Sequence, residues 1–223
     1  MIDMLEQIFK ILAPIGAAIF ALIKIWLTLK FKYSKSDTTK TIIPDKERHE
    51  SLPDAEIKSI IQRVTADIAN ILYCMDDVLL NTDAIKVLLM KCHNGGEVPS
   101  ISGPLYATVL YEVKKPNEPS TAGRWQCQPL DDAYIKMLIS LFKEKKIVNE
   151  TDKMVDGILK DTYMADGVSF AKVLEVFTTK GEYFYLSVLF KKQYAEVRAE
   201  ERDAIRACVN KIKNTYERNA KYV

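Results

Sequence analysis

The spacing of apolar residues predicts a long helix from about Pro53 to Leu80. Alternating steps of four and three residues separate its apolar positions, which is the heptad spacing of coiled coils. We therefore expect either a homodimer through helix 54–80 or a wide apolar stripe that packs only on its own domain. The predicted seam consists of Ile57, Ile61, Val64, Ile68, Ile71, Met75 and Val78.

Apolar runs rich in Val, Leu and Tyr predict strands at 84–92 and 105–113. Two further runs, 170–177 and 183–190, flank a short segment that contains Gly181 and predict a β-hairpin. This order predicts an α+β fold with an antiparallel sheet of five or six strands and helices grouped on one face. The remaining expected elements are helices at 133–142, about 155–160 and 192–218, and a short strand at 147–148.

The first 32 residues differ from the rest of the chain. The run from Ile11 to Leu29 has 19 residues, of which only Lys24 is charged. A helix of that length spans about 28 Å, close to the thickness of a bilayer core. We expect a transmembrane helix, and the alternatives are an amphipathic interfacial helix and a secretory signal peptide.

Basic residues are concentrated after this apolar run and acidic residues before it. The positive-inside rule therefore predicts a single-pass protein of the inner (cytoplasmic) membrane with its C-terminal domain in the cytoplasm. Polar residues without periodicity at 33–52 predict a linker. The expected organisation is a transmembrane anchor at 1–32, this linker, and an α+β domain at 53–223.

Composition indicates a folded protein with little charge imbalance. The 223 residues include 32 Lys and Arg, 30 Asp and Glu, and 48% hydrophobic residues. A net charge of +2 gives no basis for nucleic acid binding. The four cysteines have no paired spacing, so we expect buried reduced thiols and no metal site.

Two sequence motifs carry a family resemblance. LLMKCHNGG is followed by PLYATVLYE, and the chain closes with a strand and a Glu-Glu-Arg-containing helix in YFYLSVLFKKQYAEVRAEERDAIRACVNKI. Together with the order of helices and strands, they make residues 54–218 resemble a GAF domain, a small α+β sensor module related to PAS domains. The resemblance implies sensing or protein interaction, and a ligand pocket between the sheet and its crossing segments.

The chain departs from the GAF subsets that carry known ligands. Residues 149–153 do not match the cyclic-nucleotide signature, and Cys127 lacks the context of a bilin-attachment cysteine. We therefore expect no cofactor. The residues that could line a ligand pocket are His93, Asn94, Trp125, Cys127, Tyr163 and Phe170, with a hairpin corner and ordinary core packing as the alternative interpretation.

No catalytic motif is recognised, and the adjacent pairs Asp76-Asp77 and Asp131-Asp132 do not face each other on a helix. We therefore expect no catalytic residues. The hypothesis is a membrane-anchored, cytoplasmic, GAF-like sensory or protein-interaction protein without a catalytic output domain, whose small ligand or protein partner is unidentified. The alternative is a non-catalytic membrane scaffold, with both a bacterial and a phage origin open. An open sheet-side cavity would favour the sensor, and a filled one would favour the scaffold.

Overall fold

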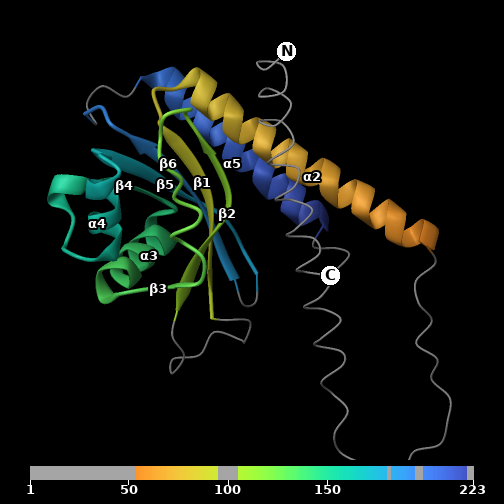
Figure 1. Cartoon of the computed structure of the whole chain (residues 1–223), viewed down its shortest axis with the longest axis horizontal. Coiled ribbons are helices and arrows are strands. Elements are labelled where there is room, and N and C mark those ends of the chain that lie inside the picture. The colour runs from red at the N-terminus through yellow and green to blue at the C-terminus, as the bar shows by residue number, and fades with distance from the viewer. Residues whose placement is uncertain (1–53, 95–104, 180–181, 194–197, 220–223) are drawn as a thin grey trace, which may run out of the picture. The chain divides into compact units, whose positions relative to one another are not determined.

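The computed structural model describes residues 54–94, 105–179, 182–193 and 198–219, which lie in one compact unit, Leu52–Val223. They form a six-stranded antiparallel sheet with strand order β3-β2-β1-β6-β5-β4 (Figure 1). The strands are β1 (Lys86–His93), β2 (Tyr106–Lys114), β3 (Gln128–Pro129), β4 (Lys146–Glu150), β5 (Phe170–Thr178) and β6 (Glu182–Phe190). The helices are α2 (Asp54–Asn81), α3 (Asp132–Glu144), η1 (Thr151–Lys153), α4 (Ile158–Ala165) and α5 (Ala199–Asn219).

The predicted α+β class and the antiparallel sheet of five or six strands are confirmed. The long first helix, the β5–β6 hairpin and the last helix lie close to their predicted positions. Two details differ. Helix α4 begins at Ile158, three residues later than expected, and the two-residue strand β3 was not predicted.

The helices cover both faces of the sheet, so the expected grouping on one face is wrong. Helices α2 and α5 pack on one face, and α3 and α4 pack on the other (Figure 1). The central strands β1 and β6 are buried on both faces, which is why they are almost continuously apolar in sequence. Strands with one solvated face would instead alternate between apolar and polar residues.

Helices α2 and α5 run antiparallel and are joined at both ends of their contact. At one end, Arg218 donates to the Asp67 carboxylate. At the other, the fully buried Glu201 carboxylate accepts hydrogen bonds from the Asp83 N–H and the Arg198 N–H, each at 3.0 Å, and from Lys192 Nζ at 2.8 Å. Glu201 thus caps the start of α5 and ties it to the end of α2.

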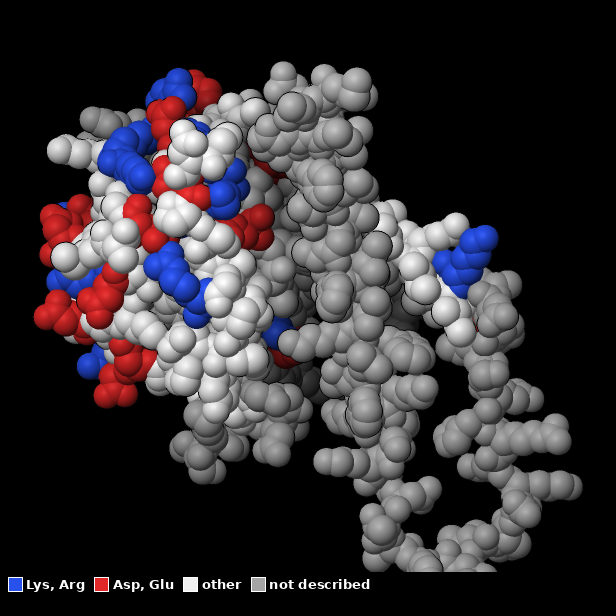
Figure 2. All heavy atoms as spheres, viewed as in Figure 1, with Lys and Arg blue, Asp and Glu red and all other residues white. Residues whose placement is uncertain are grey.

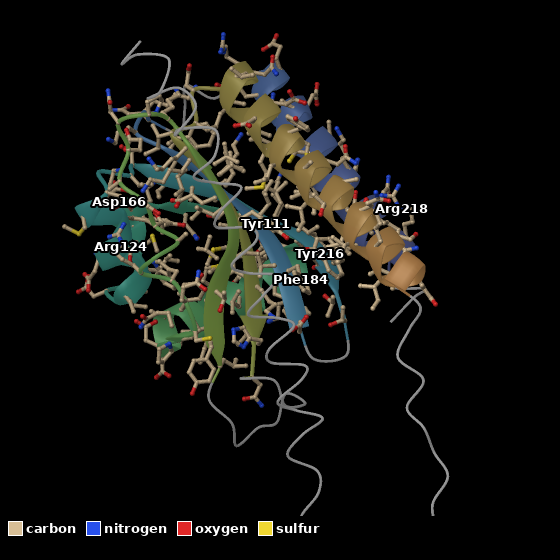
Figure 3. The ribbon with its side chains drawn as sticks, turned by 45° about the vertical axis from the view of Figure 1, so that its right-hand side comes forward. Tyr111, Arg124, Asp166, Phe184, Tyr216 and Arg218 are labelled. Atoms are coloured by element: carbon tan, nitrogen blue, oxygen red, sulfur yellow. The ribbon has the colours of Figure 1, made fainter. Side chains whose placement is uncertain are left out.

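An aromatic cluster fixes the C-terminal half of α5 to the sheet. The Tyr216 ring stacks on Phe177 with centroids 4.4 Å apart, and Phe177 stacks on Phe184 at 4.1 Å. Figure 3 shows Tyr216 and Phe184 with Tyr111 on this face, and Arg218 near the end of α5 beside α2. Such ring pairs contribute about 0.5–1.5 kcal/mol beyond their buried area.

The predicted seam of α2 has two different environments along its length. Ile71 and Met75 are buried in the core that the sheet shares with α5, and Ile68 is partly buried. The three seam residues closer to the start of the helix are exposed, with exposed fractions of 41% for Ile57, 50% for Ile61 and 36% for Val64. The domain therefore buries only the second half of the stripe.

The predicted membrane segment, Ile11 to Leu29, lies outside the described residues, as does the predicted linker at 33–52. Within the part of the chain that the structure describes, none of the helices combines the length and the apolar character required to cross a bilayer.

Candidate functional site

The space between the sheet and helices α3 and α4 is filled by the protein's own side chains. Trp125 and Tyr163, two of the predicted pocket residues, are 3% and 4% exposed there. The cavity that remains between them measures about 20 Å³. That volume holds about one water molecule, whereas a small organic ligand needs roughly 300–1,000 Å³.

Three tyrosine hydroxyls meet in this filled space. The Tyr134 and Tyr185 hydroxyls form a hydrogen bond of 2.6 Å across the gap between α3 and β6. Tyr163 approaches Ser187 at 3.5 Å. Burial raises the pKa of Tyr163 to about 12, and it raises the pKa of Tyr134 and Tyr185 further. These hydroxyls therefore stay protonated at neutral pH. They hold the helices to the sheet by hydrogen bonds and do not act as acid–base groups.

A charged network closes the edge of the same cavity. The Lys86 ammonium on β1 is fully buried, and it donates to Asp166 at 2.5 Å and to Thr121 at 2.8 Å. Arg124 donates to the other Asp166 oxygen at 2.6 Å, and Figure 3 shows the Arg124 and Asp166 side chains together at this edge. Burial raises the pKa of Asp166, but the hydrogen bonds from Lys86 and Arg124 outweigh it and hold that pKa below its usual range.

Glu112 attaches the connection between β2 and β3 to the sheet. Its carboxylate accepts hydrogen bonds from the Ser120 hydroxyl at 2.5 Å, the Thr121 N–H at 2.7 Å and the Ala122 N–H at 3.2 Å. Glu112 is the last residue of the PLYATVLYE motif quoted from the sequence. Its role here is to hold Thr121, and through it the charged network, over the cavity.

His93 and Asn94 lie at the end of β1 and are both 8% exposed. His93 Nε2 is 2.8 Å from the Thr108 hydroxyl, and its ring stacks on Tyr106. Burial lowers the pKa of His93, so the ring is neutral at pH 7. The turn expected after Asn94 lies outside the described residues.

Cys127 and Phe170 are located away from the filled cavity. Cys127 is exposed, has a left-handed backbone with φ of 52°, and donates its N–H to the Thr108 hydroxyl at 3.0 Å. Phe170 lies on the opposite face of the sheet, where it stacks on Phe190 at 4.6 Å beneath α2 and α5. The six predicted pocket residues therefore occupy three places, and of the six only Trp125 and Tyr163 line the cavity. His93, Asn94 and Cys127 lie around the end of β1, where His93 and Cys127 both contact Thr108, and Phe170 lies on the opposite face of the sheet.

A second, more open cavity of about 280 Å³ lies between α3, β4 and the start of α4. Lys136, Lys153 and Lys160 are among its lining residues. Asn149 also lines it, and the side chain of Asn149 interacts with the Tyr163 hydroxyl. Glu150 lines this cavity as well and pairs with Lys153 at 2.7 Å, so the cavity presents an acidic group beside its lysines.

Asp131 lies against Gly157, one of the residues that line this second cavity, and it caps two helices. Its Oδ1 accepts from the Tyr134 N–H of α3 at 2.8 Å, and its Oδ2 accepts from the Ile158 N–H of α4 at 2.7 Å. In the sequence, Asp131 only precedes the helix expected at 133–142. The second cap was missed because it joins residues 27 positions apart.

The surface seen in Figure 2 carries basic and acidic side chains that are interspersed rather than gathered by sign. This face therefore presents no continuous basic surface of the kind that binds a phosphate backbone. Among the residues that the structure describes, no group of three or more His, Cys, Asp or Glu side chains is arranged to hold a metal ion.

Comparisons with known proteins give similarity in structure only. No protein-family model and no curated protein matches the sequence. Solved GAF domains are similar. That of a two-component sensor histidine kinase from Bacillus halodurans has a TM-score of 0.48 and 11% identity, covering 69% of this chain and 95% of its own.

Two photoreceptor domains are similar to the same extent. The PixJ GAF domain of Thermosynechococcus elongatus, in its blue-light absorbing form, has a TM-score of 0.49 and 10% identity, covering 77% of this chain and 93% of its own. The phycoerythrobilin-bound GAF domain of a cyanobacterial phytochrome has a TM-score of 0.45 and 16% identity, and the match covers 70% of this chain and 92% of that domain. These solved GAF domains are what the chain is similar to in structure.

Proposed function

We propose that the chain is a non-catalytic interaction module, held at a membrane by the segment from Ile11 to Leu29 and associating as a homodimer through α2. The observation that carries this proposal is the filled sheet-side cavity. Its own tyrosines and Trp125 occupy the space where an open pocket would favour a ligand sensor, leaving about 20 Å³.

The exposed half of the α2 seam supplies the interaction surface. Ile57, Ile61 and Val64 are spaced so that they form one stripe along the helix. The stripe continues the heptad spacing of the buried half, and heptad stripes are complementary to their own copies. A second copy of the same helix is therefore the occupant that fits this stripe, and a shared membrane anchor would concentrate the copies on one surface.

Cysteine cross-linking of the full-length chain in mild detergent tests the homodimer. The exposed Cys127 is first replaced by Ser, and Ile57→Cys and Ile61→Cys are compared with Tyr73→Cys. Tyr73 is 66% exposed on the same helix but lies off the seam, so it is a matched control. We expect disulfide-linked dimers for the two seam variants only, and loss of the dimer in light scattering for Ile61→Glu. Equal cross-linking at Tyr73, or a monomer in the unmutated chain, would rule out the proposed dimer.

A second candidate function is sensing of a small anion in the cavity between α3, β4 and α4. The observation that favours it is the cavity of about 280 Å³ with three lysines in its lining. We expect inorganic phosphate or citrate to raise the melting temperature of the chain, and Lys153→Met to reduce that rise. Lys143→Met, an exposed lysine of α3 away from the cavity, is the control. No shift with either anion would remove this candidate.

A further inference from the structure

Two cysteines from distant parts of the chain are in contact between α2 and α5. The sulfur atoms of Cys74 and Cys208 are 3.3 Å apart, although 134 positions separate them in sequence. Each residue is 3% exposed. Both are free thiols in this structure. The other described cysteines are placed differently, since Cys92 belongs to the core beneath α3 and Cys127 is exposed.

The surrounding contacts hold these two thiols in position. The pair lies midway between the Arg218–Asp67 ion pair and the Glu201 cap, which fix the two ends of the helix contact. Neighbouring Ile71, Met75 and Ile205 are buried around it. A disulfide has a bond of about 2.05 Å, so the sulfurs need to approach by only about 1.2 Å. Side-chain rotation with a small shift of the helices supplies that distance.

We propose that Cys74 and Cys208 form an intramolecular disulfide that covalently joins α2 to α5 when the protein meets a peroxide. This modification is independent of the proposed homodimer, because it lies within one copy and on the buried side of α2.

The reaction is a two-electron oxidation of two thiols by hydrogen peroxide. The Cys74 thiolate attacks one peroxide oxygen, which breaks the O–O bond, leaves Cys74 as a sulfenic acid and releases hydroxide, which takes up a proton to become water. The Cys208 sulfur then attacks the sulfenyl sulfur, the S–O bond breaks, and the oxygen leaves as a second water with the Cys208 proton. The peroxide is reduced to two waters in total, and the two thiols are oxidised to one disulfide.

The hydrogen bonding between the thiols identifies Cys74 as the first to react. The Cys208 S–H donates to Cys74 Sγ, and this hydrogen bond lowers the pKa of Cys74. The same interaction, together with burial, raises the pKa of Cys208. Because both sulfurs are buried, peroxide reaches them only when α5 moves locally away from α2. Disulfide formation should therefore be slower than oxidation of the exposed Cys127.

The test uses the full-length chain with Cys127→Ser, treated with hydrogen peroxide under native conditions and then blocked with a thiol reagent. Before blocking, we expect the intact mass to be lower than that of the untreated chain by two hydrogen atoms. Tryptic digestion should then yield one cross-linked species that joins the Cys74 peptide, residues 64–86, to the Cys208 peptide, residues 207–211. Dithiothreitol should separate the two peptides. Sulfinic acid on either cysteine without the cross-link, or a disulfide that involves Cys92, would overturn the proposal.

Two controls show whether the folded structure, rather than random encounter of thiols, brings Cys74 and Cys208 together. The first repeats the oxidation in denaturant, where the two thiols are no longer held together, and the cross-linked yield should fall several-fold. A yield that is as high in denaturant as in native buffer would contradict the assignment. The second compares Cys208→Ser with Cys92→Ser. Oxidation should raise the melting temperature of Cys92→Ser, as in the parent chain, and leave that of Cys208→Ser unchanged.

Discussion

Gly157 lies so close to Asp131 that a methyl group built on its Cα would be 2.6 Å from Asp131 Oδ2. The same carboxylate oxygen accepts the Ile158 N–H at 2.7 Å, so it cannot retreat without losing the cap of α4. The Gly157 backbone is extended, with φ of 162°, and this conformation is open to any residue. Glycine is therefore required here by contact and not by backbone strain.

Gly157→Ala should destabilise the chain by about 1–3 kcal/mol, because either the cap breaks or α4 shifts. Urea unfolding of the full-length chain followed by circular dichroism measures the change. Gly123→Ala is the matched control, since a methyl group there meets nothing within 4 Å. Equal stability of the two variants would show that the contact with Asp131 is not required.

The fold could be predicted because its signals are local. The heptad spacing of residues 57–78 marks α2, and the apolar runs around Gly181 mark the β5–β6 hairpin. The placement of helices on both faces was also present in the sequence, as the continuous apolar run of β6. A strand with one solvated face would alternate between apolar and polar residues, so the lack of alternation in β6 indicates that both of its faces are buried.

The candidate site could be predicted only in part, because its contacts are not local. Trp125 and Tyr163 were predicted from the pocket that the GAF resemblance implies, but Lys86 and Asp166 are 80 positions apart, and nothing near either residue indicates the other. Phe170 was grouped with the cavity although Val173, three positions on along the same strand, faces it. Alternation along β5 places those two residues on opposite faces once the strand is fixed.

The hydrogen bond between the Tyr134 and Tyr185 hydroxyls should make these two residues energetically dependent on each other. Tyr134→Phe should cost about 1–2 kcal/mol, because the Tyr185 hydroxyl is left buried without this partner. The double variant should cost less than the sum of the single ones by about 0.5–1 kcal/mol. Chemical unfolding of all four proteins measures this coupling, and strictly additive losses would show that the contact contributes nothing.

Removing Asp166 should be far more damaging than removing Arg124. Asp166→Asn leaves the Lys86 ammonium buried without its counter-charge and should cost about 3–5 kcal/mol. Arg124 is 44% exposed in its side chain, so Arg124→Ala should cost at most about 1 kcal/mol. Thermal and urea unfolding at pH 7 compare the two, and similar losses would contradict this order.

The lowered pKa of Asp166 also gives this pair a pH dependence. The carboxylate is favoured in the folded state, so its stabilisation is present above its unfolded pKa, near 4, and is lost as the pH falls through the lower folded value. The stability difference between the parent chain and Asp166→Asn should therefore be constant near neutrality and shrink below about pH 4. A difference that changes between pH 6 and 8 would point to another group.

Lys172 should make the protein more stable as the pH rises from 8. It is 6% exposed on β5, and burial lowers its pKa to about 8, although the nearby Glu201 opposes the shift. Because the unfolded state binds this proton more tightly, the penalty is complete below pH 8 and declines toward the unfolded pKa of about 10.5. Lys172→Met should therefore stabilise the chain by roughly 2 kcal/mol at pH 7, and by less at pH 9. Urea unfolding of both proteins at each pH measures the difference in stability, and the exposed Lys143→Met variant is the control. Cysteines and tyrosines that titrate in this range are common to both proteins, so their contributions cancel in the difference. A constant difference between pH 7 and 9 would show that Lys172 keeps its ordinary pKa.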